Sequence, residues 1–132
     1  MATENDLITC HVLDTTAGRP AANIKVRLEG PEKVNGQETH SDAQRSYKAV
    51  TDADGRVKLW EGAFSDQKPL APTLKGIRGT SQWRLTFETE AYFGEGKTFF
   101  PEAVVVFRVD EGQHYHVPLL LSPFTFTTYR GS

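Results

Sequence analysis

The chain has a single cysteine, Cys10, among its 132 residues. No disulfide can form within it, which excludes a disulfide-stabilised secreted scaffold. No apolar run approaches the roughly 18 residues that a membrane-spanning helix needs, so we expect no contact with a membrane. An excess of basic residues is also missing, because 15 Lys and Arg stand against 17 Asp and Glu for a net charge of −2. Nucleic acid is therefore not an expected partner.

Targeting signals are missing as well. Residues 1–6 are polar and acidic, unlike a secretory or transit peptide. The last residues do not spell the Ser-Lys-Leu peroxisomal signal. We therefore expect an intracellular, cytoplasmic protein whose residues 1–6 are flexible.

Alternation of apolar and polar residues with a period of two is the main pattern, and it predicts β-strands. Turn signals separate about eight such segments, which is typical of an all-β sandwich or barrel. The length fits one domain, so we predict a single domain, 1–132, with two four-stranded sheets. The expected strands are residues 7–13, 24–28, 47–51, 57–60, 83–89, 103–109, 114–121 and 124–129.

Three stretches do not alternate. Residues 30–46 are almost wholly polar and predict a long surface loop. Residues 61–80 are rich in proline and glycine, and they hold the one candidate for a short helix, at 72–77. Residues 90–96 are expected to be a loop. The turn cluster at 14–20 joins the first two strands, which we expect to form a meander.

Histidines on a partly apolar strand face are the most informative local feature. In the strand at 114–121 one face is wholly apolar, whereas the other carries His114, His116, Pro118 and Leu120. In the first strand, His11 lies on the face that points away from the core. An outer face of mixed polarity indicates either a buried oligomer interface or a binding channel.

These residue types allow several kinds of chemistry. Histidine can move protons at neutral pH, and arginine can hold a carboxylate, a urate-like anion or a developing oxyanion in a planar fork. A serine hydrolase with a nucleophile elbow is not expected, because the chain has no Gly-x-Ser-x-Gly motif. A histidine on a strand can also be purely structural, so the residues alone leave the roles of His11 and His116 open.

We expect neither a zinc site nor a calcium site. His114 and His116 share a strand face, but no His-Glu-x-x-His or paired Cys-x-x-Cys motif accompanies them. The acidic turn Asp52-Ala53-Asp54-Gly55 lacks the later glutamate and the flanking helices of an EF-hand. We therefore predict no metal site.

Longer motifs carry a resemblance to a known family. They are His11-Val12-Leu13-Asp14, Gly18-Arg19-Pro20-Ala21, Thr51-x-x-Asp54-Gly55-Arg56, the block His114-Tyr115-His116-Val117-Pro118-Leu119-Leu120-Leu121-Ser122-Pro123, and Tyr129-Arg130-Gly131-Ser132. From about residue 7 to the end, the chain resembles the 5-hydroxyisourate hydrolases, transthyretin-like enzymes of urate breakdown. The final Tyr-Arg-Gly-Ser separates this family from transthyretin itself, the hormone carrier that shares the fold.

The resemblance implies a transthyretin-like sandwich of two four-stranded sheets with one short helix. It implies a homotetramer, a dimer of dimers, with active sites at the dimer–dimer interface. The implied reaction converts 5-hydroxyisourate and water to 2-oxo-4-hydroxy-4-carboxy-5-ureidoimidazoline, in purine catabolism and without a cofactor. A peroxisomal location stays open, because the urate pathway can be peroxisomal in eukaryotes.

Matching positions imply two sets of site residues. The catalytic set is His11, Arg56, His116 and Ser132. The substrate-binding set is His11, Arg56, Pro118, Leu120, Tyr129 and Arg130. Either His11 or His116 can be the general base, and the part played by His114 is left open.

Two other functions remain compatible with the residues. One is a transthyretin-like carrier that binds a small planar ligand without turning it over, although such a pocket has no need for two histidines and an arginine. The other is a structural β-sandwich adhesion module, which would form neither a tetramer nor a pocket. A structural condition also follows from Pro118, since proline is tolerated inside a sheet only where no ladder hydrogen bond is made.

Overall fold

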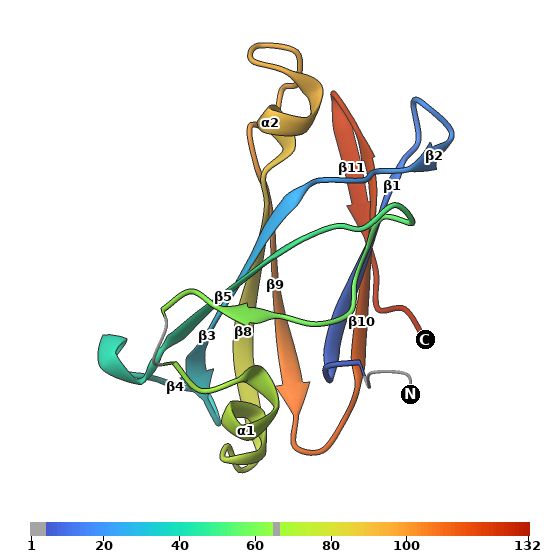
Figure 1. The fold of residues 1–132 in the computed structure, drawn as a ribbon. Coiled ribbons are helices and arrows are strands. Elements are labelled where there is room, and N and C mark those ends of the chain that lie inside the picture. Colours follow the sequence, from blue (N-terminus) through green and yellow to red (C-terminus); the bar gives the residue numbers. More distant parts are fainter. Residues whose placement is uncertain (1–4, 65–66) are drawn as a thin grey trace.

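The chain folds into two β-sheets that lie against each other as layers (Figure 1). The computed structural model describes residues 5–64 and 67–132. In the first sheet the strands follow the order β11-β10-β1-β2, and β6 also pairs with β1. These strands are β1 (Ile8–Asp14), β2 (Arg19–Pro20), β6 (Arg56–Val57), β10 (Tyr115–Ser122) and β11 (Thr125–Thr128).

The second sheet has the order β7-β5-β3-β8-β9, with β4 paired to β3. Its strands are β3 (Lys25–Val34), β4 (Gln37–Glu38), β5 (Arg45–Val50), β7 (Glu61–Gly62), β8 (Thr80–Phe87) and β9 (Ala103–Asp110). The predicted all-β sandwich is confirmed. The described sheets hold five and six strands rather than four each, because two-residue strands are too short to produce an alternating pattern.

The first strand is paired with a strand from the far end of the sequence. β1 and β10 run parallel in a continuous register that begins with the pair Ile8 and Tyr115. The predicted meander of the first two strands is wrong, because β3 belongs to the second sheet and β1 turns back only onto the short β2. Alternation identifies a strand but does not name its partner. The expected antiparallel hairpin of β10 and β11 is present.

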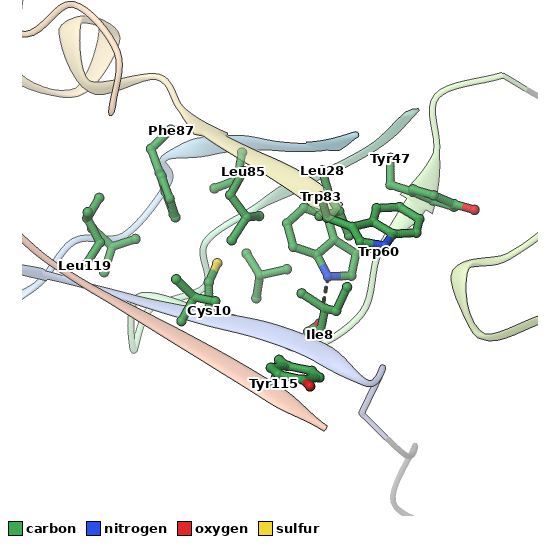
Figure 2. Close-up of a cluster of buried hydrophobic side chains, with 14 of the residues drawn as sticks. Ile8, Cys10, Leu28, Tyr47, Trp60, Trp83, Leu85, Phe87, Tyr115 and Leu119 are labelled. Carbon is green, nitrogen blue, oxygen red and sulfur yellow. Dashed lines mark hydrogen bonds between the residues drawn. The ribbon is translucent and has the colours of Figure 1, made fainter. Parts of the chain in front are cut away.

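Side chains from both sheets interlock in a shared core (Figure 2). From β1, Ile8 and Cys10 are fully buried, and Trp83 and Phe87 are fully buried on β8. Each large side chain buried in this way stabilises the fold by about 1.5–3 kcal/mol. Burial raises the pKa of the Cys10 thiol to about 12, so this cysteine is an unreactive core residue. Because side chains alternate along a strand, the residues of β1 that alternate with Ile8 and Cys10 point to the outer face of the first sheet.

The predicted loop at residues 30–46 is wrong over part of its length. β3 continues to Val34 and is followed by β4 and by a short 3-10 helix, η1 (Ser41–Ala43). The register of β3 against β8 shifts between Glu29 and Lys33, and the Arg84 Nε atom on β8 donates to Glu32 Oε2 at 3.0 Å. A surface strand pairs through its backbone and tolerates polar side chains, so a polar sequence does not exclude a strand.

Two short α-helices lie toward opposite ends of the sandwich (Figure 1). α1 (Leu70–Lys75) overlaps the predicted helix at 72–77, whereas α2 (Thr89–Phe93) replaces most of the predicted loop at 90–96. Five residues are too few for a helical period to appear in a sequence. The hydroxyl of Tyr92 donates to Asp14 Oδ2 at 2.7 Å, which ties α2 to the end of β1. Within residues 5–64 and 67–132, no helix is both long and apolar enough to span a membrane.

Asp6 belongs to the stretch expected to be flexible, and it makes hydrogen bonds to Lys58 and Trp60. Residues 1–4 of the expected flexible stretch lie outside the described residues. Asp6 is held on both sides, because its N–H donates to the Lys58 carbonyl at 2.8 Å and its Oδ2 accepts from the Trp60 N–H at 2.7 Å. The flexibility of residues 1–6 stays a prediction.

Candidate active site

The outer face of the first sheet brings two predicted catalytic residues together. His11 on β1 and His116 on β10 are both half-buried. Their ring centroids are 6.3 Å apart, with the ring planes inclined by 39°. The parallel register pairs Thr9 with His116 and His11 with Pro118, so the two histidines sit diagonally on neighbouring strands. Residues more than a hundred positions apart thus share one patch of surface.

Arg56 reaches the same face through the short strand β6, where it is the antiparallel partner of His11. The turn before it is shaped by Asp52, whose Oδ1 accepts from the N–H groups of Asp54 and Arg56, each at 2.9 Å. Gly55 has a φ of 76°, and a Cβ added there would lie 2.3 Å from a backbone oxygen of β1. Only glycine fits this position, and the acidic turn serves to place the arginine.

His11 is oriented by the same turn. Its Nε2 lies 2.8 Å from the carbonyl oxygen of Asp54. A carbonyl oxygen can only accept a hydrogen bond, so the hydrogen is on Nε2. Nδ1 is therefore the only ring nitrogen on which His11 can take up a proton.

His116 is held through Nδ1, whereas His11 is held through Nε2. Its Nδ1 lies 2.7 Å from the Thr9 hydroxyl oxygen. Burial, and then the positive charges of Arg56 and His11, lower the pKa of His116 below its ordinary value. Its imidazole is consequently neutral at neutral pH, and a neutral imidazole is the form that can accept a proton.

Residues near the carboxyl terminus close one side of this site. The Gly131 N–H donates to the His116 carbonyl at 2.8 Å and forms an isolated bridge with it. This arrangement brings Ser132 to a cavity of about 300 Å³ that Arg56 and His116 also line. Figure 1 shows the C-terminus beside β10.

Several residues of this cavity were not predicted as site residues. Thr9, Lys58 and Gly131 line it, and so does the exposed His114. Thr9 lies two positions before His11 and hence on the same strand face, but its partner could not be known without the register of β1 and β10. In the described part of the chain, no group of three or more His, Cys, Asp or Glu side chains is placed to hold a metal ion.

Pro118 and Leu120 point to the same outer face as His116, as their alternation predicts. Pro118 lies where the β10–β11 ladder is interrupted, between the pair formed by Leu119 and the bridge formed by His116. Its carbonyl accepts instead from the Thr128 hydroxyl at 2.8 Å. The condition for a proline inside this sheet is therefore met.

Tyr129 and Arg130 do not line the cavity that holds Arg56 and Ser132. They line a second hollow, of about 540 Å³, which Tyr115 and His116 also line. The guanidinium carbon of Arg130 sits 4.7 Å from the centroid of the Tyr115 ring, and Tyr129 is 55% exposed. Within one chain, neither residue joins Arg56 and Ser132 in the smaller cavity.

Known proteins resemble the chain over nearly its whole length. Residues 8–131 match the model of the HIUase/Transthyretin family. A 5-hydroxyisourate hydrolase of Mus musculus is 40% identical over 136 residues, which cover 100% of each chain. The structure of Klebsiella pneumoniae 5-hydroxyisourate hydrolase matches with a TM-score of 0.61 and 28% identity, covering 95% of this chain and 98% of that one. Sea bream transthyretin in complex with thyroxine matches with a TM-score of 0.66 and 25% identity, over 96% and 95% of the two chains.

Proposed function

The chain belongs to the HIUase/Transthyretin family, and we propose that it is a 5-hydroxyisourate hydrolase that acts in urate breakdown. The observation that carries this proposal is the grouping of His11, His116 and Arg56 on one sheet face. A carrier pocket requires neither a proton acceptor nor a fixed cation. The relatives that match the full chain are named as hydrolases, which favours catalysis over simple carriage of a ligand.

His116 is the general base in this proposal. Its Nε2 makes no hydrogen bond within residues 5–64 and 67–132. His116 also lines the cavity that holds Arg56 and Ser132, whereas His11 is not among the residues that line it. A water molecule attacks the lactam carbonyl carbon of 5-hydroxyisourate, and His116 takes the water proton as the new C–O bond forms. General-base catalysis of this kind contributes about 10²–10⁴-fold to the rate.

Arg56 stabilises the charge that the attack creates. As the carbonyl becomes tetrahedral, its oxygen gains a negative charge that the guanidinium can hold. The ring C–N bond then breaks, and the proton on His116 passes to the departing nitrogen, which returns the imidazole to its neutral form. The product carries a new carboxylate in place of the lactam carbonyl. No step requires a cofactor.

The remaining predicted residues bind and orient the substrate. His11 is fixed by the Asp54 carbonyl and positions the ring against His116. The Ser132 hydroxyl orients the substrate or the attacking water from the cavity it lines with Arg56. Pro118 and Leu120 provide an apolar surface for the planar ring. Tyr129 and Arg130 contribute from the larger hollow beside His116.

A homotetramer, arranged as a dimer of dimers, would complete this site. The outer face that holds His11 and His116 is open in one chain and also carries the half-buried Leu13 and Leu120. Within the described residues, β9 and β11 end their sheets and have free edges, which are surfaces suited to pairing with a second copy. We place the active sites at the dimer–dimer interface. Native mass spectrometry tests the assembly, and a monomer would contradict it.

The cytoplasm is the proposed compartment. The one cysteine of the sequence is a buried free thiol, as is usual where thiols are kept reduced. A fluorescent fusion imaged beside a peroxisomal marker tests this, and overlap with the marker would favour the peroxisome.

A coupled assay tests the activity directly. Urate oxidase generates 5-hydroxyisourate from urate in the cuvette, and the decay of its ultraviolet absorbance is followed with and without the protein. We expect decay well above the spontaneous rate, and loss of that acceleration in Arg56→Ala. Spontaneous decay alone, from a folded wild-type protein, would refute the hydrolase and favour a ligand carrier.

A further inference from the structure

We propose that Thr9 is a positioning residue that holds His116 with its hydrogen on Nδ1 and its lone pair on Nε2. The inference rests on the proposed function only for its catalytic consequence. The structural part concerns the contact between the Thr9 hydroxyl and His116 Nδ1, at 2.7 Å. Thr9 is not among the site residues that were predicted from the sequence.

Backbone pairing between the two strands keeps Thr9 and His116 side by side. Thr9 and His116 are register partners on the adjacent parallel strands β1 and β10, and both point to the outer face. The His116 backbone is tied on its other side by the Gly131 N–H. A β-branched side chain such as threonine has few χ1 choices on a strand. The hydroxyl is therefore held beside the ring without depending on a mobile loop.

A hydroxyl partner permits two arrangements of the hydrogen. If the Thr9 hydroxyl donates to Nδ1, then a neutral ring carries its hydrogen on Nε2 and cannot take a proton there. If Nδ1–H donates to the hydroxyl oxygen, Nε2 carries the lone pair and can act as the base. Only the second arrangement persists when His116 becomes an imidazolium, because both ring nitrogens are then donors. The second arrangement therefore serves both the resting state and the protonated state.

The choice of threonine rather than a carboxylate also fits the surroundings of His116. A negative partner would favour the charged imidazolium, whereas a hydroxyl fixes the ring without adding a charge. The charges that do act on His116 are those of Arg56 and His11, and both lower its pKa after burial has done so. The ring is thus kept neutral while Thr9 sets which nitrogen carries the hydrogen.

Nitrogen-15 NMR of the intact protein, labelled at histidine, tests the structural part without any activity. We expect the wild-type His116 at neutral pH to show a protonated Nδ1 and an unprotonated Nε2. We expect Thr9→Val, which has nearly the same shape but no hydroxyl, to shift the population toward hydrogen on Nε2. A wild-type spectrum with hydrogen mainly on Nε2 would overturn the proposal even if the variant failed to fold.

The coupled assay tests the catalytic part with three variants. Thr9→Val should lower kcat by about tenfold or more while leaving KM within about twofold, a smaller loss than the roughly 10²-fold expected for removing the base itself. Thr9→Ser retains the hydroxyl and should recover most of the rate. Thr15→Val is the matched control, because it removes a hydroxyl that donates to the Leu121 carbonyl at 3.2 Å, away from either histidine, and it should leave kcat unchanged.

The outcomes separate this inference from the proposed function. If Thr9→Val keeps wild-type kcat, or if Thr9→Ser is as impaired as Thr9→Val, the positioning role is overturned while the hydrolase remains. If the wild-type protein shows no hydrolysis, the function is refuted, and the NMR result alone then decides the role of Thr9.

Discussion

The backbone of Gly131 lies against the side chain of His116. A Cβ built on Gly131 would be 2.9 Å from the His116 Cδ2 atom and 3.0 Å from the Pro118 Cγ atom. The first distance is shorter than real Cβ contacts and the second is tighter than most of them, so either the ring or residues 129–132 would have to move. Contact with the imidazole therefore disfavours any residue larger than glycine at this position of the final motif.

Gly131→Ala should consequently impair catalysis more than stability. We expect kcat/KM to fall by up to about 10²-fold, which is the loss that a displacement of a catalytic group by roughly 1 Å can cause. Gly76→Ala is the control, since a Cβ there would meet its nearest atom at an ordinary 3.5 Å. The coupled assay measures the effect, and equal activity in the two variants would show that the ring tolerates the change.

Replacing each histidine separately should distinguish the proposed base from its neighbour. His116→Asn should lower kcat by about 10²-fold or more, as expected for the loss of a general base. His11→Asn should have a smaller effect, because His11, fixed by the Asp54 carbonyl, orients the substrate in this proposal and does not take the water proton. His40→Asn, in an exposed stretch, is the control for the substitution itself. A fall of less than about tenfold in His116→Asn, or a larger fall in His11→Asn than in His116→Asn, would contradict the assignment.

The acidic limb of the pH profile should lie below the ordinary histidine range. His116 must be neutral to act as a base, and its pKa is lowered by burial and by the charges of Arg56 and His11. Activity should therefore persist to a pH below about 6.5, the usual histidine value. Removing a nearby positive charge makes the imidazolium easier to form, so the acidic limb of any residual activity in Arg56→Gln should move to higher pH. A shift to lower pH would contradict this account of the site.

Much of this arrangement could be predicted from the sequence, and the missing parts have a common cause. Alternation placed His11 and His116 on outward faces, and the motif resemblance added Arg56 and the final residues. Neither source could give the register between β1 and β10, which decides that Thr9 rather than another residue meets His116. Partner choice depends on long-range packing, and that information is spread over the whole chain. The strand over residues 30–34 was also missed, because strands pair through their backbones and its polar side chains gave no alternating pattern.

The Tyr92 hydroxyl should contribute to stability rather than to catalysis. Burial and its bond to Asp14 raise the pKa of Tyr92 to about 12. Burial alone would raise the pKa of Asp14, but hydrogen bonds from Tyr92, Ala17 and Thr16 lower it below its usual value. Tyr92→Phe should reduce the free energy of unfolding by about 1–3 kcal/mol, since it removes a donor from a buried carboxylate.

The pH dependence of that loss follows from the direction of the Asp14 shift. A carboxyl with a lowered pKa stabilises the fold above its unfolded value, about 3.9, and the contribution disappears as the pH falls through the folded value. The destabilisation by Tyr92→Phe should thus be full at neutral pH and shrink in acid. Urea titrations at several pH values measure it, and a constant difference would show that Asp14 is not involved.

The pairing of Thr9 with His116 joins residues 107 positions apart, and this sets when the catalytic centre can exist. During synthesis, β1 emerges early and can pair with the short strands β2 and β6, but the edge that β10 covers stays unpaired until β10 has also left the ribosome. Pairings across such long separations close slowly and leave strand edges exposed in the meantime. Activity should therefore appear in one step with the last strands, and no amino-terminal fragment should show a fraction of it.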